Sequence, residues 1–300
     1  MYKHLLVPLD GSRLSEAAIP VSIFLAEKLK AKITLLHIVE SSAPKTVHGE
    51  HHLKTYEEAT EYLEKIIKAK YPKNMKIKIH VHSALKINVV NAIASHHNEL
   101  LSDLLVMTTH GWGGIKEVFF GNNAQQILNT RIMSVLFIPP DFSKNLKKVN
   151  ITKILSPIDD TELHEQGLET AVELASKCNA ELFLVNVIPT MSSLPAKHTS
   201  VGMLLPNVTR KILELHENNI RELVLSKMDE ISEKGIKVRA EISRGYPGKV
   251  INKIAKKEKI NLIVIGTHGK AGLNAFWSGS IAAKIVKKSK IAMLFVPAMK

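Results

Sequence analysis

Small residues recur at a fixed spacing near the C-terminus. Gly266 and Gly269 are followed, after nine intervening residues, by Gly279 and Ser280, and an amphipathic stretch begins at Ile281. Glycine lets backbone amides approach a ligand closely because it has no Cβ atom. The free N–H groups and the dipole at the start of a helix favour a phosphate, and a serine hydroxyl adds a donor. This spacing therefore predicts a loop that binds the phosphates of a nucleotide.

Other strands of the same half supply the remaining candidate residues. Pro157 and Asp159 end its first strand, and the Asp159 carboxylate could accept hydrogen bonds from ribose hydroxyls or help to hold Mg²⁺ on the phosphates. Backbone groups near Val187, at the end of the next strand, could read the edge of an adenine ring. His268 lies between the first two glycines and could contact a phosphate, although we favour a loop histidine held by hydrogen bonds.

None of these residues is an evident hydrolytic base, so we assign no catalytic residue and no dedicated catalytic activity. Slow ATP hydrolysis stays open, because bound Mg²⁺ and a positioned water can suffice for weak turnover. The chain has no P-loop motif, and the glycines at 111–114 follow the fourth strand, which disfavours dinucleotide binding. An adenylyl-transfer enzyme is the alternative function. Such enzymes carry an H-x-G-H or S-G-G-x-D-S loop after the first strand, and neither loop follows the first strand of either copy.

The chain contains one pattern twice. Three pairs of segments repeat, at offsets of 149, 158 and 158 residues: Leu5–Ser12 and Ile154–Thr161, Thr109–Gly111 and Thr267–Gly269, Val135–Pro139 and Met293–Pro297. The polar stretch Asp141–Asn150 is the natural linker. We therefore expect two domains, over residues 1–141 and 150–300, which also suits a chain of 300 residues.

Short apolar runs alternate with amphipathic stretches in each copy. The expected strands are His4–Leu9, Lys32–Val39, Lys76–Val81, Leu104–Thr108 and Ser134–Ile138, then Lys153–Ile158, Glu181–Ile188, Ile236–Ile242, Leu262–Gly266 and Ala292–Val296. The expected helices are Leu14–Leu29, Glu57–Ala69, Asn88–His97 and Ala124–Asn129, then Leu163–Ser176, Val208–Glu233, Gly248–Lys257 and Ile281–Lys288. Continuous β-branched runs separated by helices are typical of a parallel sheet buried on both faces. This predicts an α/β fold with two doubly wound five-stranded domains in tandem.

The G-x2-G-x9-G-S spacing, the P-x-D turn at Pro157 and Asp159, and the closing strand that ends at Pro297 are similar to those of the universal stress protein family. The resemblance spans both repeats. It implies Rossmann-like domains with strand order 3-2-1-4-5, binding of ATP or the related AMP or ADP, and pairing of domains through the fifth strands. We therefore expect a regulatory or stress-response protein that binds an adenine nucleotide, with a weak ATPase or an adenylyl-transfer enzyme as the alternative.

The first copy departs from this pattern. Gly111 and Gly121 keep their separation, and Asp10 remains, but Thr108 replaces the first glycine and Asn122 replaces the serine. A β-branched side chain at Thr108 would lie where the nucleotide should pass. We therefore expect one nucleotide per chain, in the second copy, and treat the first site as degenerate.

Bulk properties exclude several classes of protein. The net charge of +13 attracts polyanions, but the lysines are dispersed and only 5% of residues are aromatic, which disfavours nucleic acid as a partner. No apolar run approaches the ~20 residues of a membrane-spanning helix. No secretory signal is evident, and a single cysteine, Cys178, fits a reducing compartment, so we expect a cytoplasmic protein.

Two groups of histidines and the two closing strands complete the expectations. His48, His51 and His52 could bind zinc, but we favour a solvated helix start, and we read His80 and His82 as exposed or packed together on one strand face. Apolar strands at a sheet edge invite pairing. We therefore expect the two fifth strands to pair within the chain, while a homodimer of whole chains stays open.

Overall fold

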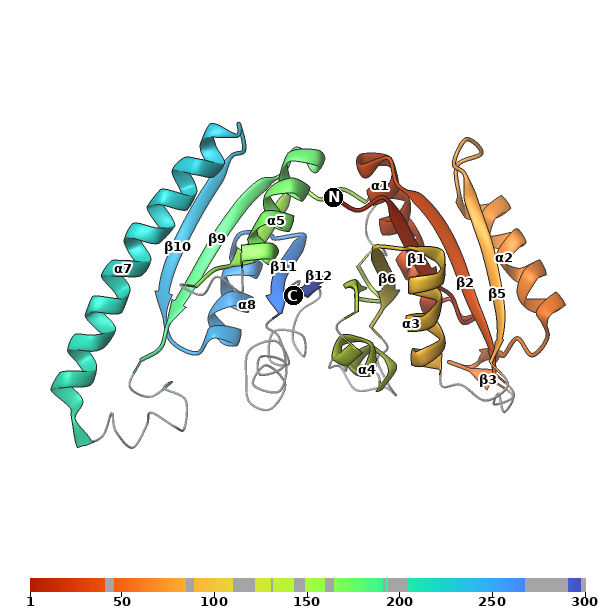
Figure 1. Cartoon of the computed structure of the whole chain (residues 1–300), viewed down its shortest axis with the longest axis horizontal. Helices are drawn as coiled ribbons and strands as arrows, with labels where there is room; N and C mark the ends of the chain where they lie inside the picture. The colour runs from red at the N-terminus through yellow and green to blue at the C-terminus, as the bar shows by residue number, and fades with distance from the viewer. Residues whose placement is uncertain are drawn as a thin grey trace. The chain divides into compact units, whose positions relative to one another are not determined.

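The computed structural model describes residues 1–40, 46–84, 89–109, 122–130, 132–142, 149–159, 165–190, 193, 204–267 and 291–297. Contacts divide the chain into two compact units, Met1–Asn150 with Lys290–Pro297 and Ile151–Ser289 with Ala298–Lys300. Each unit combines a mostly parallel sheet with helices (Figure 1). The predicted tandem α/β fold is confirmed.

The sheet of the first unit has five parallel strands in the order β5-β2-β1-β6-β7. Their bounds are β1 His4–Pro8, β2 Lys32–Glu40, β5 Ile77–Ala84, β6 Leu104–Thr108 and β7 Ser134–Ile138. Leaving aside a short hairpin between β2 and β5, this is the order 3-2-1-4-5. Strands β1, β6 and β7 are apolar and almost wholly buried, as expected for strands covered on both faces.

Strand β12 (Ala292–Pro297) joins this unit by pairing antiparallel with β7. Met293 lies opposite Phe137, and Phe295 lies opposite Val135. The rings of Phe137 and Phe295 are edge to face with centroids 5.8 Å apart, and both side chains are fully buried. The pairing of the two closing strands that the sequence predicts is therefore present, and it covers the apolar edge of β7.

The second unit repeats the parallel arrangement in the order β10-β9-β8-β11. Its strands are β8 Lys153–Pro157, β9 Glu181–Ile188, β10 Val238–Arg244 and β11 Leu262–Thr267. Strand β8 thus lies between β9, which follows it along the chain, and β11, which comes much later. The direction of winding reverses at β8.

Helices alternate with the strands along the chain in both units. Their bounds are α1 Ile19–Leu29, α2 Tyr56–Lys70, α3 Val89–Leu100, α4 Asn122–Thr130, α5 Glu165–Cys178, α7 Pro206–Glu233 and α8 Pro247–Lys257. The predicted helix Leu14–Leu29 is instead a 3₁₀ turn, η1 (Ser15–Ala18), followed by α1, because Pro20 fits only the first turn of an α-helix. The helix predicted at 281–288 lies outside the described residues. None of the described helices is both long and apolar enough to cross a membrane.

A hairpin that the sequence did not predict lies between β2 and α2. It consists of β3 (Thr46–Val47) and β4 (Glu50–His51), which pair antiparallel. The expectation of a solvated helix start at His48, His51 and His52 is wrong, because α2 begins only at Tyr56 and the side chain of His52 is 4% exposed.

Capping hydrogen bonds fix the start of α2 and separate the helix from the hairpin. Thr55 is extended and its side chain accepts a hydrogen bond from the backbone N–H of Glu58 at 3.1 Å. The Glu58 carboxylate in turn accepts from the N–H of Lys54 at 2.8 Å. These reciprocal bonds satisfy donors that a helix start leaves unpaired, so α2 cannot extend into the histidine segment.

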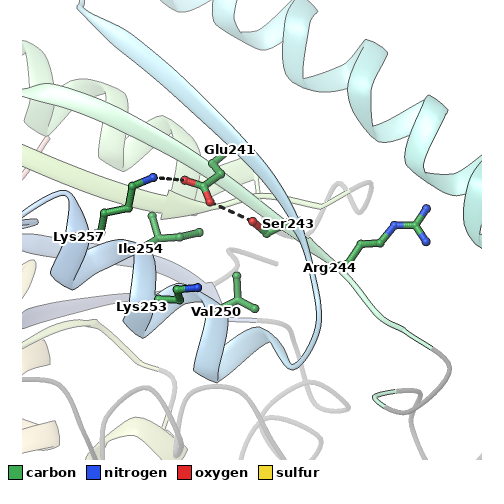
Figure 2. A pocket seen from close by; sticks show the side chains of 7 residues that line it. All are labelled: Glu241, Ser243, Arg244, Val250, Lys253, Ile254 and Lys257. Carbon is green, nitrogen blue, oxygen red and sulfur yellow. Dashed lines mark hydrogen bonds and ion pairs between the residues drawn. The ribbon is translucent and has the colours of Figure 1, made fainter.

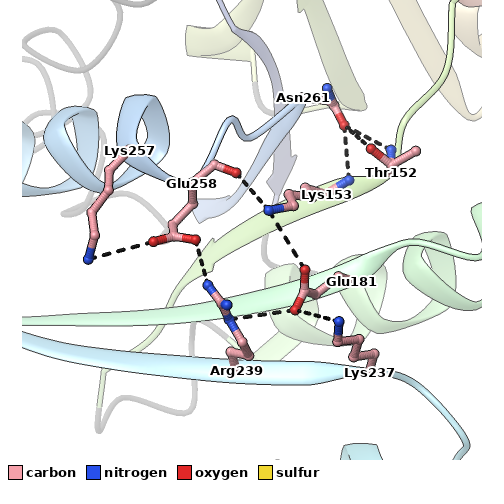
Figure 3. Close-up of polar contacts among 8 residues, drawn as sticks. All are labelled: Thr152, Lys153, Glu181, Lys237, Arg239, Lys257, Glu258 and Asn261. Carbon is pink, nitrogen blue, oxygen red and sulfur yellow. Dashed lines mark hydrogen bonds and ion pairs between the residues drawn. The ribbon is translucent and has the colours of Figure 1, made fainter.

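A polar clamp holds the amino end of the first strand in each unit. Asp103 accepts hydrogen bonds from the backbone N–H groups of Lys3 and His4, at 2.7 and 3.0 Å. At the matching place in the second unit, Asn261 Oδ1 accepts from the N–H groups of Thr152 and Lys153, at 2.8 and 2.9 Å (Figure 3). Both side chains precede the fourth strand, so each clamp joins the first strand to the fourth.

An ionic cluster lies beside the second clamp. Glu181, whose side chain is 11% exposed, has carboxylate oxygens 3.9, 3.5 and 3.5 Å from Lys153, Lys237 and Arg239 (Figure 3). These residues lie on or next to β8, β9 and β10. Glu181, together with Glu258, which also pairs with Arg239, offsets cations that would otherwise repel one another in a strongly basic protein.

We expect Asn261→Ala to lower the free energy of unfolding by about 1–3 kcal/mol, because it leaves the N–H groups of Thr152 and Lys153 without their acceptor. Urea titration followed by circular dichroism measures the change. The exposed Asn207 on α7 gives the matched control, and Asn207→Ala should change stability by less than about 0.5 kcal/mol. Equal midpoints for the two variants would contradict the clamp.

Candidate functional site

Hydrogen bonds from residues of β2 fix the turn that follows β1. The N–H of Leu9 donates to the carbonyl of Leu36 at 2.9 Å, and Nδ1 of His37 donates to the carbonyl of Leu9 at 2.7 Å. Burial lowers the pKa of His37, which keeps the ring neutral with its proton on Nδ1. The backbone immediately before Asp10 is therefore fixed on both sides.

The second unit builds the same turn with a different side chain. The N–H of Ile158 donates to the carbonyl of Val185 at 2.9 Å, and Nδ2 of Asn186 donates to the carbonyl of Ile158 at 2.8 Å. Asn186 lies 149 residues after His37, which is the offset of the repeated segments. Both amide and imidazole can donate to the carbonyl, so the turn is preserved although the residue type is not. Asp159 follows this fixed carbonyl directly.

His37 and Asn186 are residues that the sequence interpretation missed. Each is buried in the middle of an apolar strand, 1% and 4% exposed, where a polar side chain needs a partner. The signal was available in the sequence, since each residue is polar within an apolar run and the two lie at the repeat offset. Each holds the backbone carbonyl that directly precedes an aspartate, and so they position Asp10 and Asp159.

The start of α5 packs directly on the end of β11. A Cβ atom built on Gly167 would lie 2.4 Å from the backbone nitrogen of Gly266 and 2.7 Å from its Cα. The sequence assigned Gly266 to close approach of a ligand, whereas the described contact of its backbone is with Gly167. The sequence interpretation also missed Gly167, which sets how closely α5 approaches the end of β11.

The same two positions in the first unit hold larger residues. Ala18 corresponds to Gly167 and Thr108 to Gly266, and they are 0% and 2% exposed. Within the described part of the chain, the hydroxyl of Thr108 is buried without a hydrogen-bond partner. The Thr108 side chain is thus part of the packed interior of the first unit.

The carboxylate of Asp10 is engaged by its own turn. Oδ1 of Asp10 accepts hydrogen bonds from the N–H and the hydroxyl of Ser12, at 2.9 and 2.6 Å. Oδ2 lies 3.7 Å from Nε2 of His48, in the loop of the β3–β4 hairpin. Protein groups therefore occupy both oxygens that a nucleotide ribose would need.

The hairpin contacts this turn at two further points. The N–H of Arg13 donates to Oε2 of Glu50 at 2.5 Å. A Cβ atom on Gly11 would lie 3.1 Å from the Leu53 side chain, just beyond the hairpin. The hairpin segment therefore lies against the carboxyl end of β1 in the first unit.

The structure describes part of the predicted site. Pro157 ends β8, Asp159 and Val187 are half-buried after β8 and near the end of β9, and Gly266 is buried in β11. Asn122 is the first residue of α4, the helix-start position expected for the counterpart of Ser280. The remaining predicted residues lie outside the described part of the chain: His268, Gly269, Gly279, Ser280 and Ile281, with Gly111 and Gly121 of the first copy.

The model of the universal stress protein family matches residues 1–139 and 150–297. The chain therefore belongs to this family, with two copies of its domain in tandem. It is 24% identical over 312 residues to the Universal stress protein E homolog of Haemophilus influenzae, covering 98% of this chain and 96% of that protein.

Similarity to single-domain relatives and to solved structures agrees with this membership. The chain is 31% identical over 154 residues to Universal stress protein MJ0577 of Methanocaldococcus jannaschii, covering 48% of this chain and 93% of the relative. A universal stress protein from Archaeoglobus fulgidus DSM 4304 has the same fold, with a TM-score of 0.62 at 16% identity, and the match covers 98% of this chain and 96% of that one.

Proposed function

We propose that this chain binds an adenine nucleotide, ATP or the related ADP or AMP, at the carboxyl ends of β8 and β11. The observation that carries the proposal is the position of β8 between β9 and β11 in the parallel sheet. In open parallel sheets, ligands bind where the direction of winding reverses, beyond the carboxyl ends of the strands. Asp159 and Gly266 come from the two strands that flank this point.

The proposed contacts follow from the residue types. The Asp159 carboxylate accepts from the ribose hydroxyls or helps to hold Mg²⁺ on the phosphates, beside Pro157, and the backbone near Val187 reads the adenine edge. Phosphates lie on the glycine loop and the helix start that follows it. The residues assigned to that part are Gly266, His268, Gly269, Gly279, Ser280 and Ile281.

We place the site in the repeat formed by residues 150–300 and expect one nucleotide per chain. In the repeat formed by residues 1–141, the Asp10 carboxylate already accepts two hydrogen bonds from Ser12, and His48 lies against its second oxygen. Binding there would have to displace these groups. Isothermal titration of the full chain with ATP tests the stoichiometry, and mass spectrometry identifies any nucleotide that co-purifies.

We expect Asp159→Ala to weaken ATP binding by about 10–100-fold, because hydrogen bonds to a charged group contribute about 1.5–3 kcal/mol. The loss should be greater with Mg²⁺ present than with a chelator, if the carboxylate also holds the ion. Asp10→Ala is the matched control in the other repeat and should leave the affinity within about twofold. Loss of binding in Asp10→Ala with retention in Asp159→Ala would place the nucleotide in the first repeat.

A further inference from the structure

A group of histidines lies between β5 and α3 in the first unit, whereas the proposed nucleotide site belongs to the second repeat. One ligand atom each from His80 on β5 and from His96 and Glu99 on α3 lie within 4.8 Å of one another. The ring of His82, also on β5, is 4.4 Å from that of His96, and the ring of His80 is 4.5 Å from it. The arrangement brings three imidazoles and one carboxylate together.

The hydrogen bonds leave imidazole nitrogens available inside this group. Nδ1 of His96 donates to Oε2 of Glu99 at 2.8 Å, and this bond does not use the other ring nitrogen, Nε2. Nε2 of His80 is buried and has no hydrogen-bond partner among the residues that the structure describes. Buried polar atoms normally have partners, so an unpaired imidazole nitrogen beside two other ligating side chains calls for an explanation.

At the corresponding place in the second unit, the side chains of the protein interact with one another. In register with β9, Glu241 and Ser243 of β10 occupy the positions of His80 and His82. Ser243 donates to Glu241 at 3.0 Å, and Nζ of Lys257 lies 3.8 Å from the Glu241 carboxylate (Figure 2).

The helix positions correspond in the same way. Ile254 and Lys257 of α8 lie 158 residues after His96 and Glu99, the offset that also relates Asp103 to Asn261. The residues of the second unit line a cavity of ≈ 360 Å³ that holds a carboxylate and its own cation. In the first unit, Glu99 holds the position of Lys257. His80 and His82 hold the positions of Glu241 and Ser243. Among the corresponding side chains that the structure describes here, none is a lysine or an arginine.

We propose that His80, His96 and Glu99, with His82 beside them, bind a divalent transition-metal ion such as Zn²⁺. Three imidazoles and a carboxylate are ligands that suit zinc and its neighbours, whereas Mg²⁺ and Ca²⁺ prefer oxygen ligands alone. The Glu99 carboxylate, hydrogen-bonded to His96, orients that ring whether or not it also contacts the metal.

The spacing of the ligand atoms suits this ion. Zinc at about 2.0–2.1 Å from each nitrogen places tetrahedral ligand atoms about 3.3 Å apart, so separations up to 4.8 Å close by small side-chain rotations.

Titration of the full chain, prepared without a histidine tag and stripped with a chelator, tests the proposal. We expect one Zn²⁺ per chain, an upward shift of the melting temperature on adding Zn²⁺, and visible absorption of tetrahedral Co²⁺ as a spectroscopic signature. His80→Gln and Glu99→Gln should weaken Zn²⁺ binding by about 10–100-fold or more and abolish the zinc-induced shift. Glu99 is exposed, so its variant should fold even if a variant of buried His96 does not.

His51→Gln is the matched control, because His51 is 68% exposed and belongs to the other histidine group. It should bind Zn²⁺ as the unmodified chain does. The proposal is overturned if the unmodified chain binds no Zn²⁺, or if His80→Gln and Glu99→Gln keep full affinity. Loss of binding in His51→Gln alone would overturn it as well, by placing the ion at the hairpin. ATP binding should be the same in all of these variants, since the metal group and the proposed nucleotide site lie in different repeats.

Discussion

Gly279→Val is expected to abolish measurable ATP binding to the full chain. The proposal places Gly279 at the start of the helix that receives the phosphates, and a branched side chain there would occupy the space of the phosphate and hinder approach of the amides. Loss of two hydrogen bonds to a charged group corresponds to about 3–6 kcal/mol, or about 100-fold or more in affinity. Isothermal titration with ATP measures the loss.

The repeated sequence supplies a control for this variant. Gly121 holds the matching position in the first copy, and Gly121→Val should leave the affinity for ATP within about twofold. Circular dichroism and thermal melting establish that both variants are folded. A folded Gly279→Val variant with unchanged affinity would mean that the phosphates bind elsewhere and would remove the central assignment of the nucleotide site.

Gly167→Ala is expected to destabilise the second unit and to weaken nucleotide binding at the same time. The added Cβ would lie 2.4 Å from the backbone nitrogen of Gly266, a separation that only a shift of α5 or β11 can relieve. Overpacking of this kind costs about 1–3 kcal/mol. Because Gly266 is part of the proposed site, the shift should also reduce ATP affinity, by about tenfold.

Glu169→Ala provides the comparison, since Glu169 is exposed two residues further along α5. It should change the free energy of unfolding by less than about 0.5 kcal/mol and leave ATP affinity unchanged. Urea titration and calorimetry on the same preparations separate the two effects. If Gly167→Ala were as stable as the unmodified chain, the close packing of α5 on β11 would be refuted.

Local sequence was sufficient to predict the elements and their repetition. Strands such as Leu104–Thr108 and Ser134–Ile138 coincide with β6 and β7, because continuous apolar runs bury both faces whatever their neighbours are. The two copies were recognisable because each repeats its turn residues at a constant offset. The pairing of β7 with β12 was also predictable, since an apolar edge has to be covered.

Features that depend on contacts between distant residues were not predictable. The β3–β4 hairpin was missed because its strands are two residues long and carry no periodic pattern. The packing of Gly167 on Gly266 joins residues almost a hundred positions apart, and neither residue type alone indicates the partner. The tertiary structure therefore adds a helix contact at Gly266 that the sequence interpretation did not predict.

The histidines of the proposed metal site also depend partly on local sequence and partly on tertiary contacts. Sequence alone determined that His80 and His82 share one face of a strand, because side chains alternate along an extended chain. Only the tertiary structure brought His96 and Glu99 of α3 over that face, and only the strand registers made Glu241 and Ser243 the counterparts of His80 and His82. Periodicity determines which way a side chain points within its own element, whereas the groups it meets there depend on how the elements pack.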